Sequence, residues 1–224
     1  MANPVIIGNA TLYLGDCRDI LPSLQPAAIV CDPPYGMSYK SSHNNSPKRA
    51  ALTRRDGNFA QIQGDCEAFD PAHLLALNVP TILWGANYYS DKLPPGRKWL
   101  TWDKLAGKTP TPSSSDVEHA WTSERGPSRI YAHLWRGIMR AGDENVSRSP
   151  KLHPNQKPIA LMAWCLQQIK FSGPVCDAYM GSGSTGIACL RAGIPFIGIE
   201  SDPTHFDTAV RRIEAEASQG RLIA

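Results

Sequence analysis

Short apolar runs alternate with longer amphipathic segments along this chain. Five short runs are typical of buried strands: residues 11–14, 27–31, 81–84, 174–176 and 195–199. Apolar side chains at helical spacing predict helices at 158–169 and 203–217, with shorter ones at 18–24 and 71–77. Further strands are predicted at 98–102, 117–122 and 129–135, the last two as a hairpin. This alternation favours an α/β fold, a mostly parallel sheet covered by helices on both faces.

The segment Asp32-Pro33-Pro34-Tyr35 directly follows the apolar run at 27–31. A buried parallel strand would place Asp32 at the carboxyl edge of the sheet, where open α/β folds bind ligands. The two prolines restrict the backbone, so a carboxylate and backbone carbonyls are held ready to accept hydrogen bonds from one amino group. The ring of Tyr35 offers a face on which a flat base can stack. An acidic turn is the alternative interpretation of Asp-Pro-Pro alone.

A second motif begins at Asp177, after the apolar residues 174–176. Its glycines match the pattern G-x-G-x-x-G and are Gly181, Gly183 and Gly186. Such a loop lets the backbone approach a nucleotide-like ligand, and an acid about 20 residues later, here Glu200, can accept both hydrogen bonds of a ribose diol. The pattern predicts an adenosine site. If the strands before Asp32 and Asp177 are neighbours, both loops open into one crevice.

The two motifs, in this order, resemble those of a DNA amino-methyltransferase that depends on S-adenosyl-L-methionine and modifies adenine N6 or cytosine N4. The order of the motifs, with the catalytic motif first and the glycine loop last, is similar to the β-class arrangement. Residues 153–158, His-Pro-Asn-Gln-Lys-Pro, resemble the family segment that closes over the methionine part of the cofactor. Other segments that look like family pieces are Gly15-Asp16, Trp102-Asp103-Lys104 and residues 120–123. The resemblance covers nearly the whole chain and implies a Rossmann-like three-layer fold with about seven strands.

The resemblance also implies roles for individual residues. Catalysis would fall to Asp32, Pro33, Pro34 and Tyr35. The cofactor would be bound by Asp16, Asn155, Lys157, Asp177, Tyr179, Gly181, Ser182, Gly183 and Glu200, with Asn155 and Lys157 near its methionine carboxylate. A plain turn aspartate is the alternative for Asp16. No metal is implied, and adenine N6 is favoured over cytosine N4 as the target.

The implied partner is double-stranded DNA, and the positive charge is distributed in keeping with it. The net charge of the whole chain is only +3, yet residues 36–63 carry five basic side chains against Asp56. This stretch is predicted to be a mobile loop that touches phosphates through Lys40, Lys48, Arg49, Arg54 and Arg55. A short DNA-recognition segment is predicted at 121–152, with Arg125, Arg129 and Arg136 among aromatic residues. For both segments, the alternative interpretation is that the charges are incidental and simply face solvent.

Bulk composition fits a single globular domain spanning residues 1–224. Hydrophobic content is 42% and charged content 19%. No apolar stretch approaches the ~18–20 residues that span a bilayer, and the N-terminus lacks the features of a secretory signal, so we expect a cytoplasmic protein. The six cysteines form no C-x-x-C pair, which favours reduced, buried thiols over zinc ligands or disulfides.

Two other classes of function remain as alternatives. An NAD-dependent oxidoreductase would share the glycine loop and its acid, but the class does not account for the segment from Asp32 to Tyr35. A catalytically silent DNA-binding protein would keep the basic segments and lose the site, whereas every site element is present here. The sequence is compatible with a homodimer. It is also compatible with either the presence or the absence of a cognate restriction nuclease.

Overall fold

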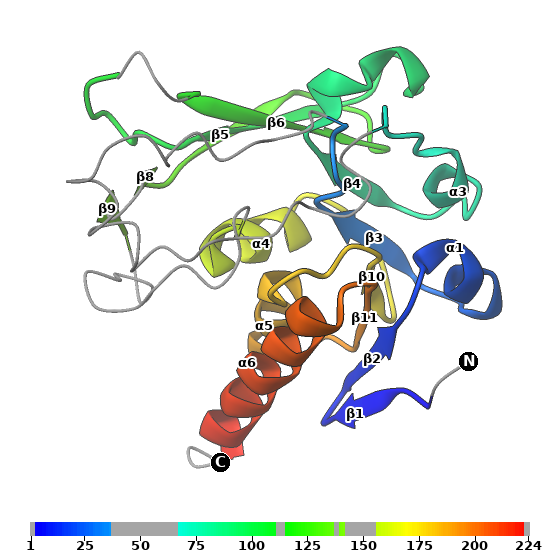
Figure 1. The fold of residues 1–224 in the computed structure, drawn as a ribbon. Coiled ribbons are helices and arrows are strands. Elements are labelled where there is room, and N and C mark those ends of the chain that lie inside the picture. Colours follow the sequence, from blue (N-terminus) through cyan, green and yellow to red (C-terminus); the bar gives the residue numbers. More distant parts are fainter. Residues whose placement is uncertain (1–2, 37–66, 111–114, 137–138, 142–155, 222–224) are drawn as a thin grey trace, which may run out of the picture.

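The computed structural model describes residues 3–36, 67–110, 115–136, 139–141 and 156–221, which form a nine-stranded sheet with helices on both faces (Figure 1). The strands are β1 (Val5–Ile7), β2 (Ala10–Leu14), β3 (Ala28–Cys31), β4 (Thr81–Trp84), β5 (Trp99–Asp103), β6 (Val117–Thr122), β7 (Arg129–Ala132), β10 (Val175–Asp177) and β11 (Phe196–Glu200). Their order across the sheet is β1-β2-β11-β10-β3-β4-β6-β5-β7. A separate two-stranded sheet pairs β8 (Trp135–Arg136) with β9 (Met139–Arg140).

The centre of the large sheet is parallel. Strands β2, β11, β10, β3 and β4 each run parallel to the next, whereas β1 and β6 are antiparallel to their neighbours. All residues of β3, β4 and β10 are buried, because helices or loops cover both faces of a central parallel strand. The predicted mostly parallel α/β sheet is therefore confirmed.

Five α-helices and three 3₁₀ helices are described. They are α1 (Cys17–Ile20), η1 (Leu21–Ser23), α3 (Ala72–Leu75), η3 (Ala86–Tyr88), η4 (Ser90–Lys92), α4 (Ile159–Leu166), α5 (Ser184–Arg191) and α6 (Pro203–Arg221). The start of α6 follows the predicted signal: Pro203 is its first residue, and the Asp202 carboxylate accepts a hydrogen bond from the backbone N–H of His205 at 2.9 Å. Within the described chain, no helix combines the length and apolar character needed to cross a membrane.

The hydrophobic core has two halves, one on each face of the sheet. Ala28 and Val30 of β3 pack with side chains of α4, α5 and α6, whereas Ile29 and Cys31 pack with those of α1 and α3. This alternation follows from the two-residue period of a strand. The five cysteines among the described residues are free and buried, as expected, and Cys66 lies outside this part of the chain.

Two sequence-based predictions about the sheet are wrong. The sheet has nine strands among the described residues, not about seven. Residues 117–122 and 129–135 do not form a hairpin, because β6 pairs with β4 on one edge and β5 on the other. Strand β7 instead pairs parallel with β5 and ends at Ala132. Of the predicted loop at 36–63, only Gly36 belongs to the described residues.

Candidate functional site

Strands β3 and β10 are parallel neighbours at the centre of the sheet, so the two sequence motifs begin at the same edge. Val175 and Cys176 pair with Ala28 and Ile29, and the chain continues from these strands into Asp32 and the glycine loop. The backbone N–H of Ala178 donates to the Cys31 sulfur at 3.1 Å, which links the two strand ends directly. The shared edge predicted for motifs that are far apart in sequence is confirmed.

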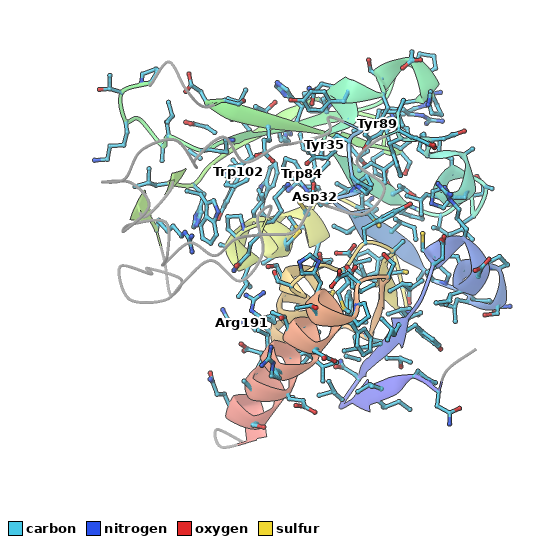
Figure 2. All side chains as sticks on the ribbon, in the orientation of Figure 1. Asp32, Tyr35, Trp84, Tyr89, Trp102 and Arg191 are labelled. Carbon is cyan, nitrogen blue, oxygen red and sulfur yellow. The ribbon has the colours of Figure 1, made fainter. Side chains whose placement is uncertain are left out.

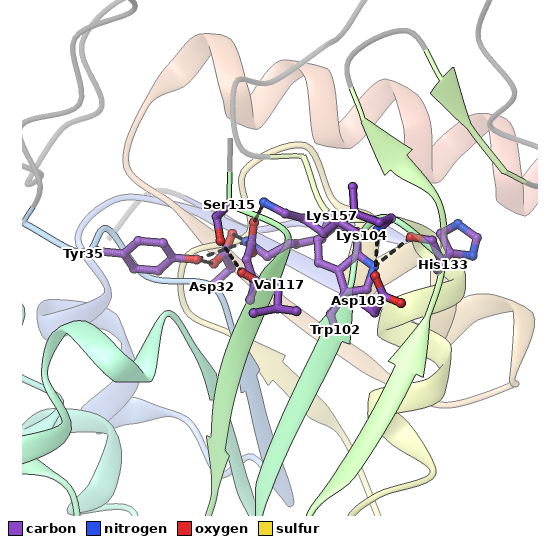
Figure 3. A network of polar contacts seen from close by, with 11 residues as sticks. Asp32, Tyr35, Trp102, Asp103, Lys104, Ser115, Val117, His133 and Lys157 are labelled. Carbon is purple, nitrogen blue, oxygen red and sulfur yellow. Dashed lines mark hydrogen bonds and ion pairs between the residues drawn. The ribbon is translucent and has the colours of Figure 1, made fainter. Parts of the chain in front are cut away.

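Asp32 lies just beyond β3, and its side chain is 17% exposed. One carboxylate oxygen accepts a hydrogen bond from the Tyr35 hydroxyl, and the other accepts one from the Lys157 ammonium at 2.6 Å (Figure 3). Burial raises the pKa of the Asp32 carboxyl, and the Lys157 charge opposes this rise. Asp32 is therefore a positioned acceptor, and Lys157 is the cation among the described residues that favours its ionised form.

Tyr35 is held by a stack of aromatic rings at the same edge. Its ring stacks on that of Tyr88, with ring centroids 5.3 Å apart and 14° between the planes. The space for Tyr35 depends on Gly85, which has a φ of +67°, because a Cβ there would lie 1.9 Å from the tyrosine Cε1 atom. Tyr88 is 51% exposed, so the stack reaches the surface.

The glycine loop joins β10 to α5. Gly183 is the N-cap of α5, has a φ of +79°, and makes no side-chain capping bond. The loop backbone is held from α6, because the Arg212 guanidinium donates to the carbonyl and hydroxyl oxygens of Ser182. The result is a fixed turn at a helix N-terminus, the arrangement expected for a nucleotide-like ligand.

Two carboxylates flank this loop. Glu200 ends β11, and its oxygens accept hydrogen bonds from the backbone N–H groups of Gly181 at 2.8 Å and Asp202 at 2.9 Å. Asp177 ends β10 and accepts from the Thr185 hydroxyl at 2.6 Å. Burial raises the pKa of the Asp177 carboxyl to about 7. Each carboxylate oxygen of Glu200 has a further lone pair, so the group can still accept from a ligand.

The other predicted cofactor residues are placed as follows. Asp16 caps α1 by accepting from the Arg18 N–H at 2.8 Å, and the preceding Gly15 N–H donates to the Glu200 carbonyl at 2.8 Å, so Asp16 lies beside the end of β11. Asp16 therefore has the role of a turn aspartate, which was the alternative to cofactor binding. The Tyr179 hydroxyl lies 2.9 Å from His73 Nε2. Asn155 lies outside the described residues.

The predicted DNA-contacting residues are only partly described. Arg125 and Arg129 are exposed near the start of β7. Lys40, Lys48, Arg49, Arg54 and Arg55 lie outside the described residues, as does the side chain of Arg136. Their roles stay predictions.

Lys157 lies at the Asp32 motif in this structure. Besides Asp32, its ammonium contacts the Tyr35 hydroxyl at 3.1 Å and the Glu118 carboxylate at 3.1 Å. The other Glu118 oxygen is 3.1 Å from the Lys104 ammonium. Sequence reasoning missed Glu118, although a lone carboxylate in the otherwise uncharged strand 117–122 is a signal that could have been noticed.

Comparisons with known proteins bear on the fold and on the family. A family model described as DNA methylase matches residues 79–211. The chain is 25% identical to the type II methyltransferase M2.MboI of Moraxella bovis, over 91% of this chain and 87% of that protein. The M1.HpyAVI–SAM complex superposes with a TM-score of 0.52 at 22% identity, covering 91% of this chain and 98% of that one. The cytosine-N4-specific PvuII DNA methyltransferase superposes with a TM-score of 0.55 at 14% identity, covering 95% and 92%. The two superpositions show a shared fold.

Proposed function

This chain belongs to the N6/N4 DNA methylase family, whose model matches residues 79–211, and from that premise we propose that it transfers a methyl group from S-adenosyl-L-methionine to the exocyclic amine of a DNA base. The observation that supports this most is the pairing of β3 with β10, because it brings Asp32 and the glycine loop to one edge of the sheet. The proposal treats residues 1–224 as one methyltransferase domain.

The glycine-loop end of this edge fits an adenosine cofactor. The turn at Gly183 leads into α5 without a capping side chain, and Glu200 is held rigidly by two backbone N–H groups. In the proposed complex, Glu200 binds the ribose diol and Asp177 contacts the amino group of the cofactor. Asp16 hydrogen-bonds the cofactor or helps to align the catalytic loop. The proposed contacts with the loop also involve Tyr179, Gly181, Ser182 and Gly183. The bound cofactor supplies an electrophilic methyl group on a sulfonium.

The proposed role of Asp32 is to make the exocyclic amine of the target base a better nucleophile. The lone pair of an exocyclic amine is delocalised into the base, and hydrogen bonds from its N–H groups localise that pair on nitrogen. Asp32 and the Pro33 carbonyl are the proposed acceptors, and Asp32 takes the proton that the nitrogen loses after methylation. Nothing in this route needs a covalent enzyme intermediate.

The amine of a paired base is inaccessible, so the target base has to be flipped out of the duplex at a cost of a few kcal/mol. Stacking on Tyr35 offsets roughly 1–3 kcal/mol of that cost. The Tyr35 ring already stacks on Tyr88, so an aromatic surface is present before DNA binds. Pro33 and Pro34 keep this surface at a fixed distance from Asp32.

Adenine N6 is the proposed target because the segment beginning with Asp32 resembles adenine-modifying relatives. The shared fold does not discriminate between the two bases, since the PvuII DNA methyltransferase, which has the same fold, is cytosine-N4-specific. The similarity to a type II methyltransferase supports double-stranded DNA as the substrate in a restriction–modification setting.

Expression in a host that lacks DNA methylation tests this function. We expect N6-methyladenine at one recurrent short sequence when genomic DNA is sequenced by a method that reads modified bases. Detection of N4-methylcytosine at that sequence would identify cytosine N4 as the target and would still support methyl transfer to DNA. Unmodified DNA in cells that contain folded protein and S-adenosyl-L-methionine would contradict the proposed function.

A separate experiment tests the phosphate contacts predicted for the basic residues Arg54 and Arg55, which lie outside the described residues. Each phosphate contact contributes about 0.9 to the slope of log affinity against log salt, so the double variant R54Q/R55Q is expected to lower that slope by about 1.8. The measurement is DNA binding by fluorescence anisotropy at several salt concentrations. A matched control, K170Q/R211Q, removes two exposed charges elsewhere and is expected to leave the slope unchanged. Equal slopes for R54Q/R55Q and the unmodified protein would show that these two residues do not touch phosphates.

A further inference from the structure

Lys157 is the centre of a buried polar cluster that connects three separate parts of the chain. Its ammonium lies 2.6 Å from an Asp32 oxygen and 3.1 Å from the Tyr35 hydroxyl (Figure 3). It also lies 3.1 Å from a Glu118 oxygen, and its side chain is only 7% exposed. Asp32 and Tyr35, which share a hydrogen bond, are both labelled in Figure 2. The ammonium donates hydrogen bonds to Asp32 and Tyr35, and its contact with Glu118 is an ion pair. The backbone of Lys157 directly precedes Pro158 and α4, which limits its freedom.

Glu118 is itself held from the opposite side. It lies on β6 opposite Trp102 of β5, and Lys104, just beyond β5, reaches its second oxygen at 3.1 Å. The backbone N–H of Lys104 also donates to the Asp116 carbonyl at 3.0 Å, which extends the pairing of β5 and β6. Cations and anions therefore alternate in the order Lys104, Glu118, Lys157, Asp32.

We propose that Lys157 and Glu118 are positioning residues for methyl transfer: Glu118 fixes the Lys157 ammonium, and the ammonium keeps Asp32 ionised and aimed at the target amine. This inference rests on the proposed function. It gives Lys157 a task at the reacting base, in place of the contact with the methionine carboxylate that the family resemblance implies.

The charges around Asp32 explain why a cation is needed there. Among the described residues, the titratable groups that face it are Tyr35 from its own loop, Lys157 from the segment before α4, Glu118 from β6, Asp177 from β10 and Tyr89 from the segment after η3. Burial raises the Asp32 pKa, Lys157 lowers it, and Glu118 raises it. Burial alone would lower the pKa of Lys157, but the Asp32 and Glu118 carboxylates outweigh burial and raise it, so the ammonium stays charged.

Removal of Lys157 would leave two carboxylates facing each other in a partly buried site. The Asp32 pKa would then rise, because burial and the Glu118 charge would act without an opposing cation. A protonated Asp32 donates a hydrogen bond and cannot take the proton of the methylated amine. As the pH falls, activity would then be lost at a higher pH than in the unmodified protein, since Asp32 is ionised only above its pKa.

The test compares Lys157→Met with the double variant K157M/E118Q. An opposite charge at this distance changes a carboxyl pKa by roughly 1–3 units, so the acid limb of the kcat profile of K157M is expected to move to higher pH by about that amount. Neutralising Glu118 as well removes the repelling carboxylate, so the limb of the double variant is expected to lie between those of K157M and the unmodified protein. The affinity for S-adenosyl-L-methionine, measured by calorimetry, is expected to stay within a few-fold.

Glu118→Gln alone provides a second variant, which keeps the cation. Its acid limb is expected to move to lower pH, because one of the charges that raise the Asp32 pKa is gone, and its kcat at the plateau is expected to fall, because the Lys157 ammonium loses the carboxylate that fixes it. Lys98→Met is the matched control: Lys98 is 9% exposed and donates to Gln168 at 2.9 Å, outside this cluster. It is expected to change thermal stability but leave the pH profile in place.

Titration of the Asp32 carboxyl by carbon-13 NMR, assigned with Asp32→Asn, follows the same pKa without any reaction. A rise in K157M and a partial return in the double variant would support the inference even if no DNA were methylated, which would contradict only the proposed function. An unchanged Asp32 pKa in K157M would overturn the inference. A loss confined to cofactor affinity, with no recovery in the double variant, would assign Lys157 to the methionine carboxylate instead.

Discussion

Replacement of Asp32 by alanine is expected to lower the rate of methyl transfer by about 10²–10⁴-fold, the range typical for loss of a positioned acid–base group. The truncation removes the carboxylate that accepts from Tyr35 and Lys157 and that we propose accepts from the target amine. Cofactor affinity is expected to change by no more than a few-fold, because the glycine loop and Glu200 are untouched. The measurement is transfer of a labelled methyl group to DNA, with cofactor binding followed by calorimetry.

Two further variants sharpen this experiment. Asp32→Asn keeps one oxygen acceptor but cannot take up the proton, so we expect a loss smaller than that of Asp32→Ala yet still measurable. Asp207→Ala removes an exposed carboxylate on α6 and is expected to retain full activity. Full activity in Asp32→Ala would remove Asp32 from the mechanism.

Replacement of Glu200 by alanine is expected to weaken cofactor binding by about 1.5–3 kcal/mol, the cost typical of losing hydrogen bonds to a charged acceptor. This corresponds to a roughly ten- to 150-fold increase in Kd. The proposed bonds to the ribose diol are lost, and so are those that Glu200 accepts from Gly181 and Asp202, which fix the glycine loop. Calorimetric titration with S-adenosyl-L-methionine measures the effect.

The control for this variant is Glu216→Ala. Glu216 forms a paired contact with Arg191, whose side chain is 43% exposed, so its loss removes a carboxylate of the same type without touching the site. We expect unchanged cofactor affinity in that variant. If Glu200→Ala also binds the cofactor with unchanged affinity, the ribose contact assigned to Glu200 is wrong.

Much of the scaffold could be predicted because its signals are local. The strand at 81–84 has the predicted bounds, and α6 begins at Pro203 after the Asp202 cap. The hairpin predicted from 117–122 and 129–135 failed because adjacency in sequence does not decide which strands pair. Strand β6 is occupied on both edges by β4 and β5, so β7 could join only beyond β5.

The candidate site was likewise predicted only in part. The Asp32 motif, the glycine loop and Glu200 were found from residue type and spacing, since each depends on a strand end and the turn that follows it. The stacking of Tyr35 on Tyr88 and the space provided by Gly85 could not be predicted, because they require the end of β4 to lie beside the end of β3. Glu118 was missed for the same reason.

The sequence by itself determined the α/β alternation and the two motifs, because these follow from periodicity, backbone restrictions and residue order. The resemblance of those motifs to a known family indicated the family. Only the tertiary structure decided that Lys157 lies between Asp32 and Glu118. The three residues are far apart in sequence and meet through the packing of β3, β6 and the segment before α4. Electrostatic interactions depend on distance and burial, so the charge environment of Asp32 is a property of the folded chain.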